Sequence, residues 1–241
     1  MNTQITLDNL AKLKLSGMAK VYQGILSMPV QDRPSPDQLM ANLTEAEIQE
    51  RANKKTQMFL RISKLRYNAI LENIFCNAHR NFTKENLLAL ADCSFIQRAE
   101  NILITGATGC GKSYLACALG RQACMLGYKT VYFGMARLIE KISQAKLEGT
   151  YAKFINYLDR TNLIIIDDFG LHPLDTVTRL ALLQIMEDSY GKRSIIVTSQ
   201  LPVANWHQYL DDPTIADAIM DRLSVNASRI ELKGDSLRKK N

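Results

Sequence analysis

A glycine-rich pattern near the middle of the chain constrains the fold most strongly. Residues 106–113 read GATGCGKS, which matches the phosphate-loop pattern G-x-x-x-x-G-K-[ST] in full. An apolar run, residues 101–105, precedes the pattern, and a helix-like stretch, residues 114–119, follows it. Because the pattern is informative only between a strand and a helix, these flanks matter as much as the glycines. The sequence therefore predicts a strand, a phosphate loop and a helix in succession.

The residue types of this loop have a chemical reason. Glycines let the backbone curl so that successive N–H groups point at phosphate oxygens, and the start of the next helix adds positive potential. Lys112 is expected to reach the β- and γ-phosphates, and the Ser113 hydroxyl to bind Mg²⁺. We therefore expect ATP and Mg²⁺ as cofactors. The predicted ATP-binding residues are Gly106, Ala107, Thr108, Gly109, Cys110, Gly111, Lys112, Ser113 and Tyr114.

A second apolar run ends in two carboxylates. Residues 163–166 are aliphatic and mostly β-branched, and Asp167 and Asp168 follow them directly. Such a run is typical of a buried parallel strand, whose carboxyl end faces the ligand crevice of an open α/β sheet. We expect Asp167 to hold Mg²⁺ together with Ser113, and Asp168 to orient and polarise the attacking water. This pair predicts an ATPase rather than a protein that only binds ATP.

The composition argues against a membrane protein and a secreted protein. The 241 residues suffice for one sizeable core and a smaller appendage, and no run approaches the ~20 apolar residues of a membrane helix. The five cysteines include no C-x-x-C pair, which favours reduced thiols. The first residues do not resemble a secretory signal, and we expect a cytoplasmic protein. The net charge of +6 favours a polyanionic partner.

Hydrophobic spacing predicts two domains. Residues 1–28 have helical spacing with a break at Ser16–Gly17, and Thr44 begins a capping-box pattern for a long helix towards Tyr67. After residue 98, strand and helix patterns alternate. The predicted strands are 101–105, 130–133, 163–167, 194–199 and 228–232. We therefore expect a helical N-terminal domain over residues 1–70 and an α/β domain with a five-stranded parallel sheet over residues 71–241.

A run of cations lies in the last part of the predicted N-terminal domain. From Arg51 to Leu71 the chain contains six Lys and Arg and no acid, with Phe59 and Tyr67 interleaved. A solvated helix face is one interpretation, and contact with DNA phosphates is the other. The missing acids and the net charge favour phosphate contact. The candidate DNA-binding residues are Arg51, Lys54, Lys55, Arg61, Lys64 and Arg66.

Two further segments carry polar groups suited to phosphate chemistry. The strand over residues 194–199 ends in Thr198 and Ser199, with Gln200 next, and a polar side chain there can contact the γ-phosphate or the attacking water. Arg222 lies near the end of an amphipathic helix. An arginine offered to a neighbouring subunit's γ-phosphate stabilises charge that develops during transfer. By itself, however, the position of Arg222 favours a surface cation of the helix.

Five segments together resemble the IstB-like ATPases, the transposition helper proteins of insertion sequences and relatives of the DnaC helicase loaders in the AAA+ superfamily. The matching segments are residues 13–19, 167–170 with Pro173, 198–202, 221–223 and 231–239. The resemblance implies an AAA+ core and makes Arg222 the arginine finger. It also implies Ser199 as the first sensor residue and Arg238 as the second, with Thr198, Gln200 and Lys239 as open alternatives. The implied catalytic residues are Asp168, Ser199, Arg222 and Arg238.

The chain departs from the common AAA+ pattern at two places. Asp168 stands where most members have glutamate, and its shorter arm suits slow hydrolysis and a switch rather than a motor. Residues 73–99 contain no adenine-binding signature that can be assigned residue by residue.

The resemblance implies a DNA-binding ATPase that assists transposition. Such a protein forms a homo-oligomer on duplex DNA with ATP between subunits, and it recruits or stimulates a partner transposase. The alternative is a DnaC-like loader whose N-terminal region grips a replicative helicase. A metabolite kinase is disfavoured because little chain follows Arg222 to form a lid, and a non-hydrolysing scaffold because Lys112, Asp167 and Asp168 are all present.

Overall fold

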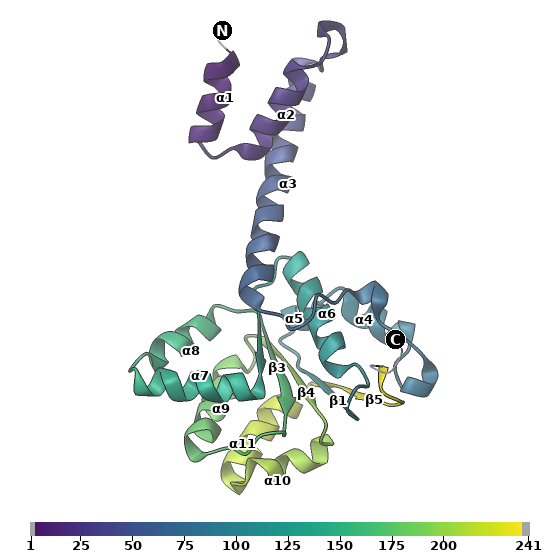
Figure 1. Ribbon diagram of the computed structural model, residues 1–241, viewed down its shortest axis with the longest axis vertical. Helices are drawn as coiled ribbons and strands as arrows, with labels where there is room; N and C mark the ends of the chain where they lie inside the picture. The colour runs from purple at the N-terminus through teal and green to yellow at the C-terminus, as the bar shows by residue number, and fades with distance from the viewer. Residues whose placement is uncertain (1–2, 238–241) are drawn as a thin grey trace. The chain divides into compact units, whose positions relative to one another are not determined.

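A computed structural model of the chain describes residues 3–237 (Figure 1). The described chain divides into two compact units, one ending at Met58 and the other beginning at Phe59. The first is helical and the second contains the sheet.

The first unit consists of helices. They are α1 (Thr3–Lys12), α2 (Ser16–Leu26), the short 3₁₀ helix η1 (Val30–Asp32) and the first part of α3 (Pro36–Ser63). Lys14 adopts a left-handed conformation with φ 59° between α1 and α2. The expected break is therefore present, two residues before Ser16–Gly17.

Helix α3 begins and ends earlier than expected. The Gln38 N–H donates to the Ser35 hydroxyl at 3.4 Å, so Ser35 caps the helix and Pro36 starts it. The Thr44 hydroxyl instead donates to the carbonyls of Met40 and Ala41, one turn back within the helix. The prediction of a capping box at Thr44 was wrong because the Ser-Pro start lies upstream. The helix stops before Tyr67 because Lys64 has a φ of 53°.

A close contact between α2 and α3 organises the first unit. The Glu47 carboxylate accepts the N–H groups of Gly17 at 2.8 Å and Met18 at 3.4 Å, at the start of α2. A Cβ on residue 17 would lie 2.3 Å from the carbonyl oxygen of Ala46. Only glycine permits this approach, which gives residues 13–19 a structural role within the unit.

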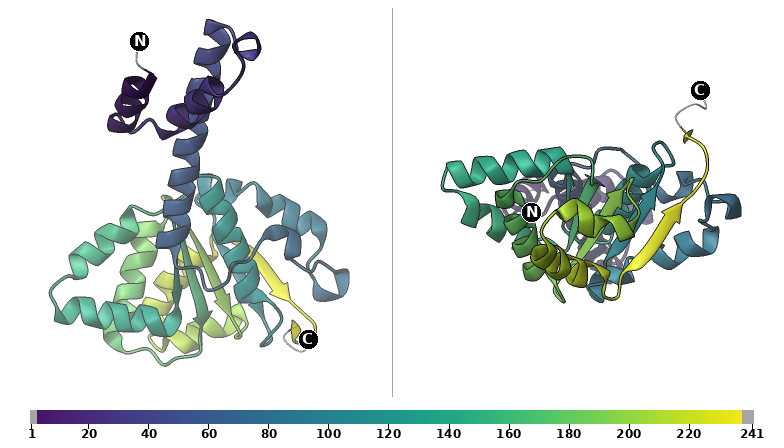
Figure 2. Two further views of the ribbon diagram at one scale, coloured as in Figure 1. Left: turned by 45° about the horizontal axis from the view of Figure 1, so that its top comes forward. Right: turned by 90° about the horizontal axis from the view of Figure 1, so that it is seen from below.

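The second unit contains a parallel sheet with the order β2-β3-β4-β1-β5. Its five strands are β1 (Ile102–Gly106), β2 (Thr130–Gly134), β3 (Leu163–Phe169), β4 (Ser194–Ser199) and β5 (Ser228–Leu232). The expected fold class and strand positions are confirmed within residues 3–237. Figure 2 shows helices on both sides of this sheet.

Helices cover both faces of the sheet. They are α4 (Lys84–Ala91), α5 (Ser94–Gln97), α6 (Lys112–Met125), α7 (Met135–Leu147), α8 (Tyr151–Asp159), α9 (Thr176–Ser189), α10 (Trp206–Leu210) and α11 (Pro213–Ser224). Short 3₁₀ turns, η2 (Leu71–Asn73), η3 (Ala78–Arg80) and η4 (Val203–Asn205), lie in the connections.

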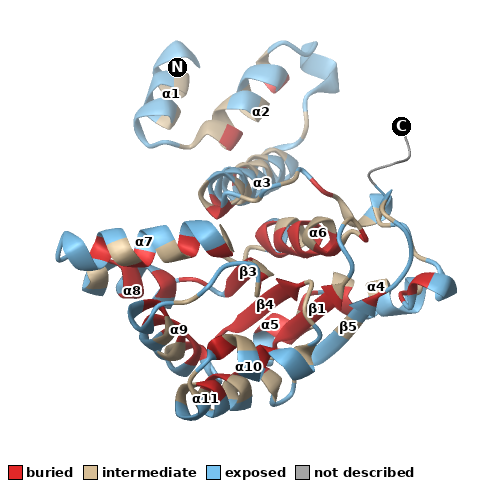
Figure 3. Cartoon of the chain, turned by 60° about the horizontal axis from the view of Figure 1, so that its bottom comes forward, coloured by how far each residue is buried: buried red, intermediate tan, exposed pale blue. Residues whose placement is uncertain are grey.

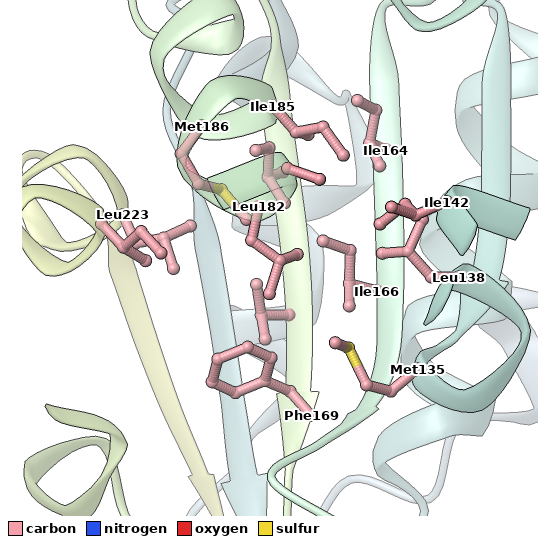
Figure 4. Packing of buried hydrophobic residues seen from close by; sticks show 14 of the residues in the cluster. Met135, Leu138, Ile142, Ile164, Ile166, Phe169, Leu182, Ile185, Met186 and Leu223 are labelled. Carbon is pink, nitrogen blue, oxygen red and sulfur yellow. The ribbon is translucent and has the colours of Figure 1, made fainter. Parts of the chain in front are cut away.

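The strands alternate between two hydrophobic clusters. Ile164 and Ile166 of β3 pack with residues from α7, α8, α9, α10 and α11 (Figure 4). Leu163 and Ile165 pack with residues from α4, α5 and α6 on the opposite face. The central strands β1, β3 and β4 are accordingly almost entirely buried, whereas the edge strand β5 is largely exposed (Figure 3). Because side chains alternate with a period of two, Asp167 lies on the α6 face.

Four of the five cysteines are buried, and Cys76 is half-buried. All five are free thiols, and burial raises the pKa of Cys93 to about 12 and that of Cys117 to about 11. These thiols therefore stay protonated and behave as small apolar groups. Across residues 3–237, no helix has the length and apolarity needed to cross a membrane.

Candidate functional site

The phosphate loop follows β1 and leads into α6, as its sequence context predicts. Gly106, Gly109 and Gly111 have φ angles of 145°, 84° and 94°, values that side-chain-bearing residues rarely adopt. The buried Lys112 ammonium donates to the carbonyls of Gly106 and Ala107, both at 2.8 Å. The loop thus surrounds the Lys112 ammonium with its own carbonyl groups. When ATP binds, the ammonium can donate to phosphate oxygens in place of these carbonyls.

The Asp167 carboxylate accepts hydrogen bonds from hydroxyl groups on three different elements. Ser113 at the start of α6 donates to Asp167 Oδ1 at 2.7 Å, and Tyr132 of β2 donates to Oδ2 at 2.5 Å. The Thr198 hydroxyl of β4 also donates to Oδ1. Burial and the bond to Asp167 raise the pKa of Tyr132, so the phenol remains a donor. Asp167 itself is fully buried at the carboxyl end of the sheet.

This donor set fits Mg²⁺. A hydroxyl and a carboxylate in contact are hard oxygen ligands, and Mg²⁺ at such sites usually completes its shell with phosphate oxygens and water. Within residues 3–237, no group of three or more His, Cys, Asp or Glu side chains could hold a metal by itself. Ser113 and Asp167 therefore suit a metal that arrives with a phosphate.

Asp168 lies on a strained bulge. Its φ is 62°, and the pairing of β3 with β4 shifts register between Ile166 and Phe169. The Asp168 N–H donates to the Thr198 hydroxyl at 3.1 Å, and its carboxylate Oδ2 lies 3.2 Å from Arg66 Nη1. Asp168 also lines the cavity above the phosphate loop. A non-glycine residue held in this conformation beside a cavity is typical of a functional site.

A cavity of about 410 Å³ joins the phosphate loop to an aromatic wall. Thr108, Gly109 and residues 111–114 line one end, together with Asp168 and Gln200. Of the nine predicted ATP-binding residues, the lining thus includes six. The remainder of the cavity is formed mainly by Tyr67, Asn73, Ile74, Phe75, Arg80, Phe82, Leu232 and Leu237.

Arg80 connects the two ends of this cavity. Its guanidinium donates to the carbonyls of Phe75 and Cys110, and it lies over the Phe75 ring, 5.5 Å from the centroid. Cys110 belongs to the phosphate loop, so Arg80 fixes the aromatic wall to the loop. No sequence signal points to these residues, since their stretch has no recognised pattern and a single arginine there is ordinary.

The three polar residues at the end of β4 differ in their contacts. Thr198 lies on the α6 face with Asp167, and Gln200 accepts a hydrogen bond from Thr108 at 2.7 Å while lining the cavity. The Ser199 hydroxyl donates to the Phe169 carbonyl at 2.5 Å and accepts from the Leu201 N–H at 3.0 Å. Ser199 points away from the loop because strand side chains alternate. The structure therefore favours Thr198 and Gln200 over Ser199.

Arg222 lies at the other end of the sheet from the phosphate loop. It is on α11, with Glu187 at 3.5 Å and Asp221 at 3.3 Å, and it lines a separate cavity of about 140 Å³. The Asn101 amide donates to the Arg222 carbonyl at 3.0 Å, and Asn101 directly precedes β1. The length of β1, about 15 Å, therefore lies between Arg222 and the loop. Arg238 and Lys239 lie outside the described residues.

The cation run does not form one unbalanced face. Arg51 pairs with Glu47 at 2.8 Å and Lys54 with Glu50 at 3.4 Å, acids one turn earlier on α3. Arg66 lies past the end of α3, beside Asp168. The residues through Met58 contain seven Lys and Arg and six Asp and Glu, a net charge of +1, which leaves +5 of the total +6 for the second unit. The second unit therefore carries most of the basic excess.

Comparisons with known proteins identify the family of the chain. The model of the family of IstB-like ATP binding proteins matches residues 8–241. The chain is 40% identical to the insertion sequence ATP-binding protein y4pL of Sinorhizobium fredii over 97% of this chain and 96% of that protein. Its identity to y4uH of the same organism is 41%, over 97% and 94%.

Solved structures show the same fold. A crystal structure of the DnaC helicase loader matches with a TM-score of 0.56 and 21% identity, covering 69% of this chain and 98% of that one. The likeness confirms the expected AAA+ core. The chain belongs to the family of IstB-like ATP binding proteins.

Proposed function

We propose that this IstB-like ATP binding protein is a cytoplasmic ATPase of an insertion sequence and assists transposition. It assembles on duplex DNA with ATP between subunits and recruits or stimulates the transposase. One observation carries the ATPase proposal: the buried Asp167 contacts Ser113 of the phosphate loop, while the adjacent Asp168 faces the same cavity.

The chain's own residues divide the work of hydrolysis. The loop amides and Lys112 bind the phosphates, and Ser113 and Asp167 would hold Mg²⁺, which would supply positive charge next to the phosphate oxygens. Asp168 accepts a hydrogen bond from the attacking water and orients it. Gln200 and Thr198 fix the geometry around these groups by their contacts with Thr108 and Asp167. The aromatic side of the cavity, which includes Phe75 and Phe82, receives the adenine base of ATP.

Replacing Asp168 with asparagine tests the assignment of the water-orienting group. Asparagine tolerates a left-handed backbone, so the bulge is retained while the negative charge is lost. We expect ATP affinity within about threefold of the unmodified protein and a kcat reduced by about 100-fold or more, as for loss of a catalytic base. Steady-state phosphate release and binding of a fluorescent ATP analogue measure the two quantities. Asp217→Asn, at an exposed position on α11, is the control, and normal turnover by Asp168→Asn would refute the role.

DNA contact is proposed for the cations at the end of α3 and just beyond it. Arg61 and Lys64 belong to the second unit, which holds the basic excess, whereas Arg51 and Lys54 pair with acids. We expect Arg61→Gln with Lys64→Gln to weaken duplex binding equally for unrelated sequences, because phosphate contacts carry no base information. The slope of log K against log salt should flatten by about 0.9 for each DNA phosphate that is no longer neutralised.

Titration of labelled duplex at several salt concentrations measures this effect. The control pair, Lys84→Gln with Lys192→Gln, makes the same charge change at exposed positions elsewhere in the second unit. An unchanged slope in the Arg61 and Lys64 variant would place the DNA-binding surface elsewhere. ATP affinity should be unaffected in both variants.

A helicase loader is the second candidate, favoured by the structural likeness to DnaC. That likeness concerns the fold, whereas the insertion-sequence relatives match 97% of the chain at about 40% identity. Size-exclusion chromatography separates the two proposals. A transposition helper should elute with duplex DNA only when ATP is present, and a loader should elute with a replicative helicase instead.

A further inference from the structure

Arg66 lies beside both carboxylates of the candidate ATPase site. Its Nη1 atom is 3.2 Å from Asp168 Oδ2 and 3.6 Å from Asp167 Oδ2. Asp167 is fully buried and the Asp168 side chain is 31% exposed, so the ion pairs are only partly screened by water. The cation therefore offsets the repulsion between two neighbouring negative charges.

The backbone around Arg66 is fixed on the helix of the phosphate loop. Tyr67 contacts the ring of Tyr114, with centroids 6.1 Å apart, and the fully buried Ala69 packs on Cys117 and Ala118. Asn68 accepts a hydrogen bond from Arg121 of the same helix. Residues on both sides of Arg66 are thus anchored to α6, and the guanidinium is directed at the carboxylates by a packed segment.

Leu65 packs closely against α6 beside Gly120. A Cβ on Gly120 would lie 2.9 Å from Leu65 Cδ2 and 2.6 Å from Ile165 Cδ1. The segment before Arg66 is therefore pressed against the helix and against β3, the strand that carries Asp167 and Asp168. The position of Arg66 relative to these acids is set by the core of the second unit.

We propose that Arg66 is a positioning residue for ATP hydrolysis, which holds the Asp168 carboxylate in the orientation that the attacking water requires. The proposal rests on the ATPase function proposed above. Asp168 needs such support because its side chain is shorter than glutamate and its backbone is strained at a bulge. Among the described residues, Asp168 lines the cavity and Arg66 does not. Arg66 therefore acts on the reaction through its contact with Asp168 and not by touching the nucleotide.

Steady-state kinetics of Arg66→Ala test the proposal. Because misplacing a catalytic group by about 1 Å costs up to 100-fold, we expect kcat to fall about 10- to 100-fold. KM for ATP and the affinity for a fluorescent ATP analogue should stay within about twofold, since the phosphate-binding groups are untouched. Arg66→Lys should recover part of kcat because it restores the charge but not the planar guanidinium. Arg160→Ala, at an exposed arginine of the same unit, is the control.

A double-mutant cycle with Asp168→Asn distinguishes positioning from a merely structural role. If Arg66 acts through Asp168, Arg66→Ala should have little further effect on kcat once Asp168 is asparagine. Additive losses, an equal loss of ATP affinity, or a kcat increased by Arg66→Ala would each overturn the proposal. An unmodified protein without ATPase activity would overturn the proposed function as well, whereas normal activity in Arg66→Ala would overturn only the role of Arg66.

Discussion

Replacing Lys112 with alanine is expected to abolish ATP binding. The ammonium is buried and donates to two carbonyls of the phosphate loop, and the same donors serve the phosphates in the ATP-bound protein. Loss of a charged hydrogen-bonding partner costs about 1.5–3 kcal/mol for each hydrogen bond, so two such bonds correspond to a loss of affinity of about 100-fold or more. The two carbonyls left behind can turn to water in the open cavity, and the fold should survive.

Equilibrium binding of a fluorescent ATP analogue measures this loss, and thermal unfolding without nucleotide verifies the fold. Lys192→Ala removes an exposed lysine from the same unit and should bind ATP normally. If Lys112→Ala retained affinity within a few-fold of the unmodified protein, the loop could not be the principal phosphate site. The ATPase proposal would then fail together with it.

The features predicted correctly from sequence are those that depend on local patterns. The phosphate loop requires glycines at fixed spacing, and the buried strand before Asp167 requires only a short aliphatic run. Both are present in the structure at the expected positions. The choice of Ser199 as first sensor rested on the resemblance instead, because three consecutive polar residues do not reveal which face of the sheet α6 covers. In the structure, Ile196 and Thr198 alternate towards α6, and Ser199 lies on the other side.

The groups missed by sequence reasoning come from segments remote from the loop. Sequence order groups Arg66 with the cations of α3, but the helix ends at Ser63 and the next residues pack on α6. Arg80 reaches the Cys110 carbonyl across 30 residues of sequence. Neither contact has a spacing rule, since both depend on how loops fold over the sheet. Similarly, the acids that pair with Arg51 and Lys54 lie just before the acid-free run and therefore outside it.

Replacing Arg222 with alanine is expected to reduce turnover by about 1,000-fold or more while leaving ATP bound, as for loss of an arginine finger. Arg222 lies beyond the opposite end of β1 from the phosphate loop and lines a different cavity. It therefore cannot reach the phosphates bound by its own chain. Its pairs with Glu187 and Asp221 are partly exposed and contribute little to stability, so the substitution should not unfold the protein.

Mixing two inactive variants tests whether Arg222 acts on a neighbouring subunit. Arg222→Ala retains an intact Asp168, and Asp168→Asn retains both ATP binding and Arg222. In a mixed oligomer with head-to-tail contacts, about a quarter of the interfaces join an intact Asp168 to an intact Arg222. ATPase activity should therefore return on mixing, to about a quarter of the unmodified rate at equal amounts if the interfaces act independently. Arg160→Ala in place of Arg222→Ala controls for the loss of any arginine. If mixing restored nothing although the variants co-assembled, action across the interface would be excluded.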